Sequence, residues 1–145
     1  MTTAEHLETI DRLRTREFPA VRGRSGPVVS GPGYHLAELG GSRWYGDEDA
    51  ADRLAGEEQL SAEHGALAER LTDRWGTPQV FGLHGLLART GAGEELPQPW
   101  QEVCATAGHI HLWRAQDRWV ALYTAHWGAD HSPQLMAAVT VIDPP

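Results

Sequence analysis

Alternation of apolar and polar residues near the end of the chain constrains the fold more than any other sequence feature. The segment Gly108–Gly128 reads GHIHLWRAQDRWVALYTAHWG and contains three of the six tryptophans and three of the eight histidines. Its residues follow a two-residue period on both sides of positions 116–117, which predicts a β-hairpin. A third strand is expected at 135–142, where odd and even positions are both largely apolar, so it should lie inside the sheet. The pattern therefore predicts a three-stranded antiparallel meander.

A two-residue turn at 116–117 determines which residues of the hairpin share a face. This register places three pairs opposite each other: Arg114 and Trp119, Leu112 and Ala121, and Ile110 and Tyr123. One face is then mostly apolar and is the better core face; it carries Ile110, Leu112, Trp119, Ala121, Tyr123 and Ala125. The other face carries His109, His111, Trp113, Val120, Leu122, Thr124 and His126.

The histidines of this second face suggest a candidate metal site. His109 and His111 point to one side of their strand, and His126 falls diagonally next to His109 on the neighbouring strand. Three imidazoles and a water would complete a catalytic zinc site, and Asp130 and His131 are further candidate ligands. The chain has no H-E-x-x-H and no paired C-x-x-C motif that would support zinc independently. Three readings of this face stay open: zinc bound by the histidines, contact with a partner through the histidines and Trp113, or packing against the protein's own helices.

Two amphipathic helices are expected to cover the sheet. Thr2 and Glu5 form a capping box at the start of the first helix, which should end before Pro19. A longer helix is expected near residues 57–75, followed by the stop signals Gly76 and Pro78. Its apolar face steps by three or four residues and consists of Leu60, His64, Leu67, Leu71 and Trp75.

Shorter elements complete the expected fold. Strands are predicted at 34–39 and 80–83, and a short helix at 100–105. The segment Gly23–Gly33 has four glycines and two prolines and is predicted to be a loop. The whole chain is expected to form one α+β domain over residues 1–145, with a mainly antiparallel sheet, the C-terminal meander, and packing by the N-terminal helix and the long helix.

Composition limits the classes of function. The chain has 145 residues and a net charge of −8 at pH 7, which disfavours nucleic acid as a partner because phosphates repel an acidic surface. No run of eighteen apolar residues is present, so no membrane span is expected. Cys104 is the only cysteine, as suits a reducing compartment, and the predicted localisation is cytoplasmic. All twelve basic residues are arginine, which is typical of a bacterial genome with high GC content.

Two stretches of the chain resemble small uncharacterised proteins of actinobacteria. They are LTDRWGTP at 71–78 and the run from LWR at 112–114 through DRWV at 117–120 to VIDPP at 141–145. The resemblance covers roughly the C-terminal half. It implies a small bacterial domain and leaves activity open, because such proteins have no assigned catalytic residues to carry over.

These observations favour a small acidic protein-binding module, similar in kind to immunity proteins or chaperones, that has no catalytic activity. Size, acidity and an aromatic-rich sheet face support this hypothesis, since aromatic residues are enriched at interface hot spots. The partner is expected to be another protein or a second copy of this chain. One alternative is a metal-binding protein or enzyme that uses His109, His111 and His126. Another is a small-molecule carrier with an apolar pocket lined by Trp113 or Trp119.

Overall fold

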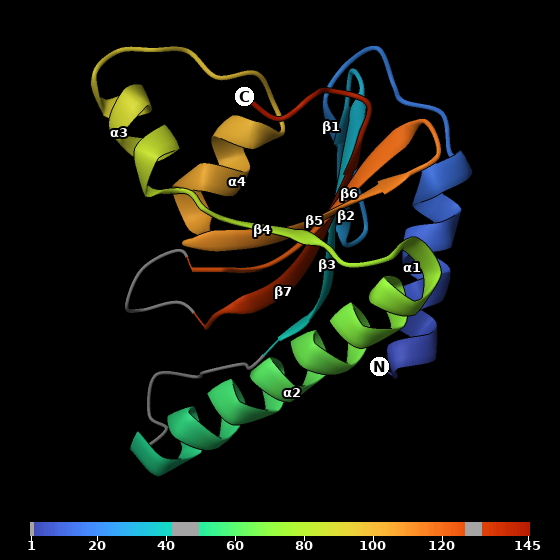
Figure 1. The fold of residues 1–145 in the computed structure, drawn as a ribbon, viewed down its shortest axis with the longest axis vertical. Helices are drawn as coiled ribbons and strands as arrows, with labels where there is room; N and C mark the ends of the chain where they lie inside the picture. Colours follow the sequence, from blue (N-terminus) through green and yellow to red (C-terminus); the bar gives the residue numbers. More distant parts are fainter. Residues whose placement is uncertain (1, 42–49, 127–131) are drawn as a thin grey trace.

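A seven-stranded antiparallel sheet forms the centre of the molecule (Figure 1). The computed structural model describes residues 2–41, 50–126 and 132–145. The strand order is β1-β2-β3-β7-β6-β5-β4, with the strands β1 Gly23–Ser25, β2 Val28–Gly31, β3 Tyr34–Gly41, β4 Gln79–Gly82, β5 His109–Ala115, β6 Arg118–Ala125 and β7 Gln134–Thr140. The helices are α1 Thr3–Thr15, α2 Ala50–Trp75, α3 His84–Gly91 and α4 Trp100–Thr106. The α+β class is confirmed.

The C-terminal meander is confirmed as strands β5, β6 and β7. Arg114 pairs with Trp119 and Leu112 with Ala121, as the two-residue turn requires. Gln116 occupies the first turn position with φ +60°, a left-handed conformation. Strand β7 lies between β3 and β6, which explains why both of its faces are apolar.

Helices α1 and α2 cover one face of the sheet. The Thr2 hydroxyl caps α1 by accepting the Glu5 backbone N–H at 3.2 Å, as the capping box predicts. The apolar stripe of α2 packs on the sheet through Leu60, Leu67 and Leu71, which are all buried. Helix α2 starts at Ala50 and not near residue 57 as predicted. The sequence pattern misses the first turns because they carry none of the buried apolar residues.

Helix α4 packs on the opposite face of the sheet, and α3 lies beside it (Figure 1). The core on this side is built from buried aromatic and aliphatic residues, among them Trp100, Val103, Ile110, Tyr123 and Ala138. The expected core face of the hairpin is therefore buried here. No helix in the described part of the chain combines the length and apolar character needed to cross a membrane.

The prediction of a loop over 23–33 is wrong, because this segment contains β1 and β2. Gly26-Pro27 and Pro32-Gly33 lie at the turns, and the residues between them pair as short strands. Gly26 has φ +59° and so allows the tight turn between β1 and β2. Val28 and Ser30 face inward, and both are buried.

Candidate functional site

Trp113 is buried between the sheet and the end of α2. Its side chain is 2% exposed, and its Nε1–H donates a hydrogen bond to the Gly76 carbonyl at 3.0 Å. The bond joins β5 to Gly76, the residue that follows the end of α2 and has φ +86°. The protein's own helix therefore covers this part of the second hairpin face, and Trp113 fixes the position of that helix.

Three histidines gather beside Trp113; we refer to His64, His109 and His111 as the histidine cluster. His109 and His111 lie two residues apart on β5, and α2 brings His64 to them. The ring centroids of His64 and His111 are 4.9 Å apart, and those of His109 and His111 are 5.9 Å apart. The sequence places His64 on the apolar stripe of α2, but only the helix packing shows that it meets β5.

Burial keeps the inner members of the histidine cluster neutral. It lowers the pKa of His64 from 6.5 to about 4, and the nearby His111 and His109 rings add to this lowering. Burial also lowers the pKa of His111. Both rings are therefore uncharged at neutral pH.

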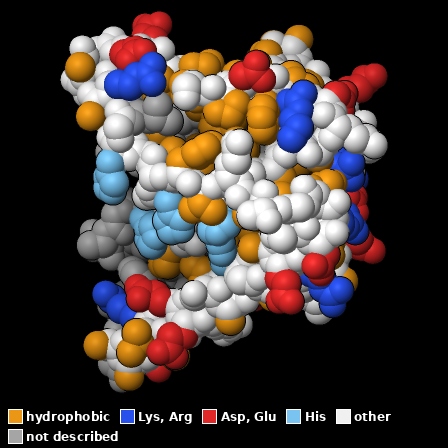
Figure 2. Space-filling model, viewed as in Figure 1, with side chains coloured by type: hydrophobic (Ala, Val, Ile, Leu, Met, Phe, Trp, Pro, Cys, Tyr) orange, Lys and Arg blue, Asp and Glu red, His pale blue; other side chains and the backbone are white. Residues whose placement is uncertain are grey.

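His126 belongs to the same region, although it lies after the end of β6. Together with His64 and His109 it lines a cavity of about 350 Å³ between α2 and the sheet. Figure 2 shows histidine side chains grouped on this face of the molecule, next to hydrophobic side chains. Within residues 2–41, 50–126 and 132–145, no three His, Cys, Asp or Glu side chains are arranged to hold a metal ion. Asp130 and His131 lie outside the described residues.

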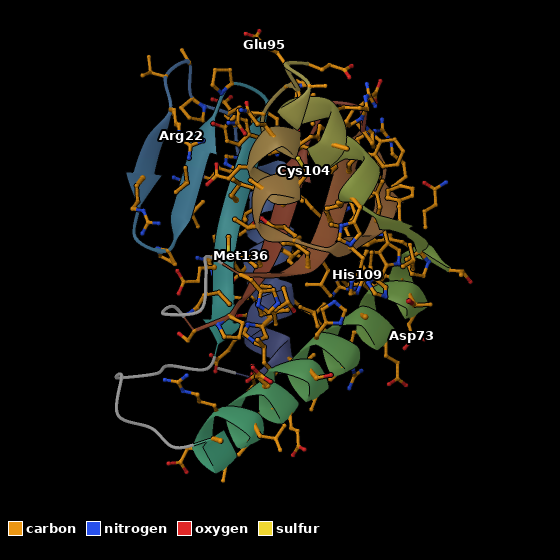
Figure 3. The ribbon with its side chains drawn as sticks, turned by 90° about the vertical axis from the view of Figure 1, so that its left-hand side faces the viewer. Arg22, Asp73, Glu95, Cys104, His109 and Met136 are labelled. Atoms are coloured by element: carbon orange, nitrogen blue, oxygen red, sulfur yellow. The ribbon has the colours of Figure 1, made fainter. Side chains whose placement is uncertain are left out.

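Cys104 is separated from the histidine cluster by the sheet. It belongs to α4 and to the core on that side, where it is buried and its thiol donates to the Gln101 carbonyl. Figure 3 shows Cys104 on α4 and His109 near α2. The two residues therefore do not form a nucleophilic Cys–His pair.

Comparison of the chain with protein-family models, with curated proteins and with solved structures gives no match.

Strand β4 is the outermost strand of the sheet on the side of the histidine cluster. Val80 pairs with His111, and Phe81 pairs with Ile110. Since paired residues of antiparallel strands point to the same face, Val80 lies beside the histidine cluster and Phe81 on the α4 side. Val80 is 57% exposed and Phe81 is 36% exposed, so β4 presents an apolar side chain to solvent on each face.

An apolar cavity of about 370 Å³ lies next to Phe81. Its lining combines β4, α3, α4 and the C-terminus; it includes Phe81, Leu83, Trp100, Ile110, Pro144 and Pro145. The Trp100 Nε1–H donates to the Ile142 carbonyl at 3.0 Å and so holds the C-terminal segment against α4. Arg89 also lines the cavity, and an ion pair with Glu94 neutralises it.

The sequence does not reveal this cavity or the edge position of β4. Residues 80–83 are predicted to form a strand, and β4 confirms it one residue earlier. The neighbours of a strand, however, depend on long-range pairing that a local pattern does not record. The apolar cavity contains neither Trp113 nor Trp119, the two tryptophans expected to line a pocket.

Proposed function

We infer that this protein binds an extended segment of another protein, which adds as a new strand to β4. The observation that supports this proposal is the exposed apolar edge formed by Val80 and Phe81. An outer strand presents backbone N–H and C=O groups that can pair with a further strand. Main-chain hydrogen bonds then supply affinity, and pockets for alternate side chains supply specificity.

The two edges of the sheet differ in a way that favours β4. Strand β1, at the other edge, is three residues long and contains no apolar side chain, and its Arg24 is exposed. Charged residues and short strands are common protections against unwanted strand pairing. Strand β4 is also short, at four residues, but it reads QVFG and so has no charge and no proline to oppose strand pairing.

The site also indicates the chemistry of the partner segment. A partner residue on the Phe81 face of β4 lies near the apolar cavity, which has room for a large aliphatic or aromatic side chain. Because strand side chains alternate between faces, the partner should carry apolar residues two positions apart. The net charge of −8 favours a segment with basic flanks.

Selection from a phage-displayed library of random peptides tests this proposal. The expected binders alternate apolar residues and carry Arg or Lys at their ends. Phe81→Ser should weaken binding of a selected peptide about tenfold, which corresponds to about 1.4 kcal/mol. Leu54→Ser is the matched control, since Leu54 is 56% exposed but lies on α2.

N-methylation of the peptide separates strand pairing from simple hydrophobic contact. In a strand, alternate amides point toward the neighbouring strand, so methylating one set should abolish binding and methylating the other set should not. The proposal would be overturned if methylating either set of amides weakened binding equally. It would also be overturned if the selected peptides bound the Phe81→Ser variant as tightly as they bind the wild type. Sedimentation of the protein alone would contradict a foreign partner if it shows a dimer that Phe81→Ser dissociates.

A small apolar ligand is the second candidate, and the volume of the apolar cavity favours it. About 370 Å³ falls within the usual range of small-molecule sites. Such a ligand should quench the fluorescence of Trp100, and Trp100→Phe should remove that quenching. Phe81 of β4 lines the cavity, but ligand binding would not use the backbone groups at the edge of this strand. A peptide that pairs with β4 without displacing the ligand would therefore assign the two functions to separate places.

A further inference from the structure

Ser30 and His35 form a hydrogen-bonded pair at the other end of the sheet from β4. They lie opposite each other on β2 and β3, with 2.5 Å between the Ser30 Oγ and the His35 Nδ1. The His35 Nε2 lies 3.3 Å from the carbonyl oxygen of Arg16. Because a carbonyl only accepts, Nε2 carries the ring hydrogen, which leaves the lone pair of Nδ1 to accept the Ser30 hydroxyl proton. A serine, a basic nitrogen and a group that orients the ring are the parts of an activated nucleophile.

The segment after α1 holds the His35 ring in place. His35 is fully buried, and Phe18 stacks on it with 4.7 Å between ring centroids. Arg118 lies over the Phe18 ring at 4.2 Å and donates to the carbonyls of Leu13 and Arg16. Burial lowers the pKa of His35 most strongly. The hydrogen bond to the Arg16 carbonyl raises this pKa, and the charges of Arg16 and Arg118 lower it by smaller amounts. The ring is thus fixed and neutral, as a proton acceptor must be.

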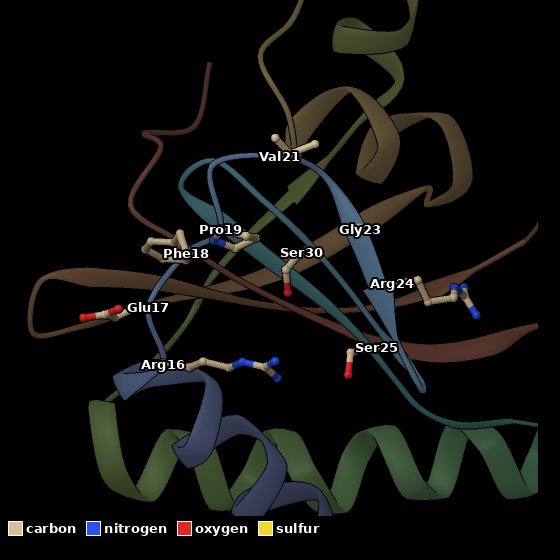
Figure 4. A pocket seen from close by; sticks show the side chains of 9 residues that line it. All are labelled: Arg16, Glu17, Phe18, Pro19, Val21, Gly23, Arg24, Ser25 and Ser30. Carbon is tan, nitrogen blue, oxygen red and sulfur yellow. The ribbon is translucent and has the colours of Figure 1, made fainter.

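Ser30 lies at the wall of a cavity of about 390 Å³, which we refer to as the arginine cavity. Arg16, Arg24 and Ser25 also line it, and Figure 4 shows the Arg16 side chain on the same side as the hydroxyls of Ser25 and Ser30. Ser30 itself is 9% exposed, whereas Val21 in the lining is 78% exposed, so a ligand would reach the Ser30 hydroxyl through this cavity. Glu17 also lines the cavity, but its carboxylate points away from the Arg16 guanidinium (Figure 4). The guanidinium of Arg16 on the side of Ser30 favours an anionic ligand there.

We propose that Ser30 is a nucleophile that attacks carboxylic esters whose acyl part carries a second carboxylate. The Ser30 Oγ forms a bond to the acyl carbon while its proton passes to the His35 Nδ1. The bond from the acyl carbon to the alcohol oxygen breaks, and His35 returns the proton to the leaving alcohol. Water then attacks the acyl-serine with His35 as base, which releases the carboxylic acid and restores the Ser30 hydroxyl. Arg16 binds the second carboxylate of the substrate.

A fluorophosphonate probe tests the nucleophile directly. The probe should label one residue of the wild-type protein, and peptide mapping should find the phosphonate on Ser30, with fluoride released. Ser30→Ala should remove the label. Ser61→Ala is the matched control, because Ser61 is an exposed serine of α2 outside the arginine cavity, and it should leave labelling unchanged. If Ser30→Ala does not fold, mapping of the wild-type adduct alone decides the question.

Two esters test the role of Arg16. The wild type should hydrolyse 4-nitrophenyl succinate more efficiently than 4-nitrophenyl acetate, and Arg16→Gln should raise KM for the succinate about tenfold more than it raises KM for the acetate. Absence of label on Ser30, or equal hydrolysis by wild type and Ser30→Ala, would overturn the nucleophile. Equal KM values of wild type and Arg16→Gln for the succinate would overturn the substrate class. Neither result depends on peptide binding at β4.

Discussion

Acidification should destabilise the protein through His64. Burial lowers the pKa of this ring from 6.5 to about 4 in the folded state. The unfolded chain therefore takes up a proton near pH 6.5, whereas folded His64 stays neutral until about pH 4. Because the folded pKa is the lower one, the stabilisation is complete above pH 6.5 and is lost as the pH falls toward 4.

The size of this effect follows from the shift. Stability falls by about 1.4 kcal/mol per pH unit below 6.5, which amounts to about 2 kcal/mol at pH 5. Urea unfolding followed by circular dichroism at pH 7 and pH 5 measures it. His64→Leu keeps the apolar stripe of α2 and cannot take up the proton, so the wild type should lose about 2 kcal/mol more than this variant.

The difference in acid-induced stability loss between the wild type and His64→Leu separates the effect of His64 from that of the other histidines with lowered pKa values. The pKa values of His6, His35 and His111 are also lowered by burial, and these rings add a similar acid sensitivity to both proteins. His84→Gln replaces an exposed histidine and should behave as the wild type. An equal loss of stability in wild type and His64→Leu would refute the packing of His64 against β5.

Four further substitutions test the fold by urea or thermal unfolding. Leu67→Ala removes a fully buried side chain of α2 and should lower the free energy of unfolding by about 3 kcal/mol. Leu54→Ala, at a position 56% exposed, should lower it by less than about 0.5 kcal/mol. Equal losses would contradict the orientation of α2. Gln116→Gly relieves a φ of +60° and should stabilise by about 0.5 kcal/mol, so a loss of stability would contradict the turn. Trp113→Phe removes the hydrogen bond to Gly76 and should cost about 2 kcal/mol, visible as a lower thermal midpoint.

Local patterns predict the meander and the helices well, because the spacing of apolar residues within one strand or helix shows which of its faces is buried. The alternation around 116–117 correctly pairs Arg114 with Trp119. The stripe from Leu60 to Leu71 correctly predicts the buried face of α2. Residues 50–56 belong to the same helix but leave Leu54 exposed, so their side chains carry no stripe for a pattern to detect.

Long-range pairing accounts for most of what the sequence does not predict. The segment 23–33 looks like a loop because its glycines and prolines dominate the composition, yet they occupy the turns of two short hairpins. Ser30 meets His35 only through that pairing, which a loop would not provide. The candidate histidines His109 and His111 are correctly placed on one face, but the arrival of His64 depends on how α2 crosses β5. For the same reason the edge of β4 becomes visible only when the strand order is known.

The central claim is that a peptide adds as a strand to β4. Amide hydrogen exchange, measured with and without a binding peptide selected from the random library, tests this claim most directly. Strand addition predicts that slowed exchange on peptide binding centres on residues 79–82, since outward-facing amides of β4 gain hydrogen-bond partners. The amides of β1, at the opposite edge of the sheet, should exchange at the same rates with and without the peptide. Slowed exchange at β1 or along α2, with residues 79–82 unchanged, would contradict the assignment of β4 as the binding edge.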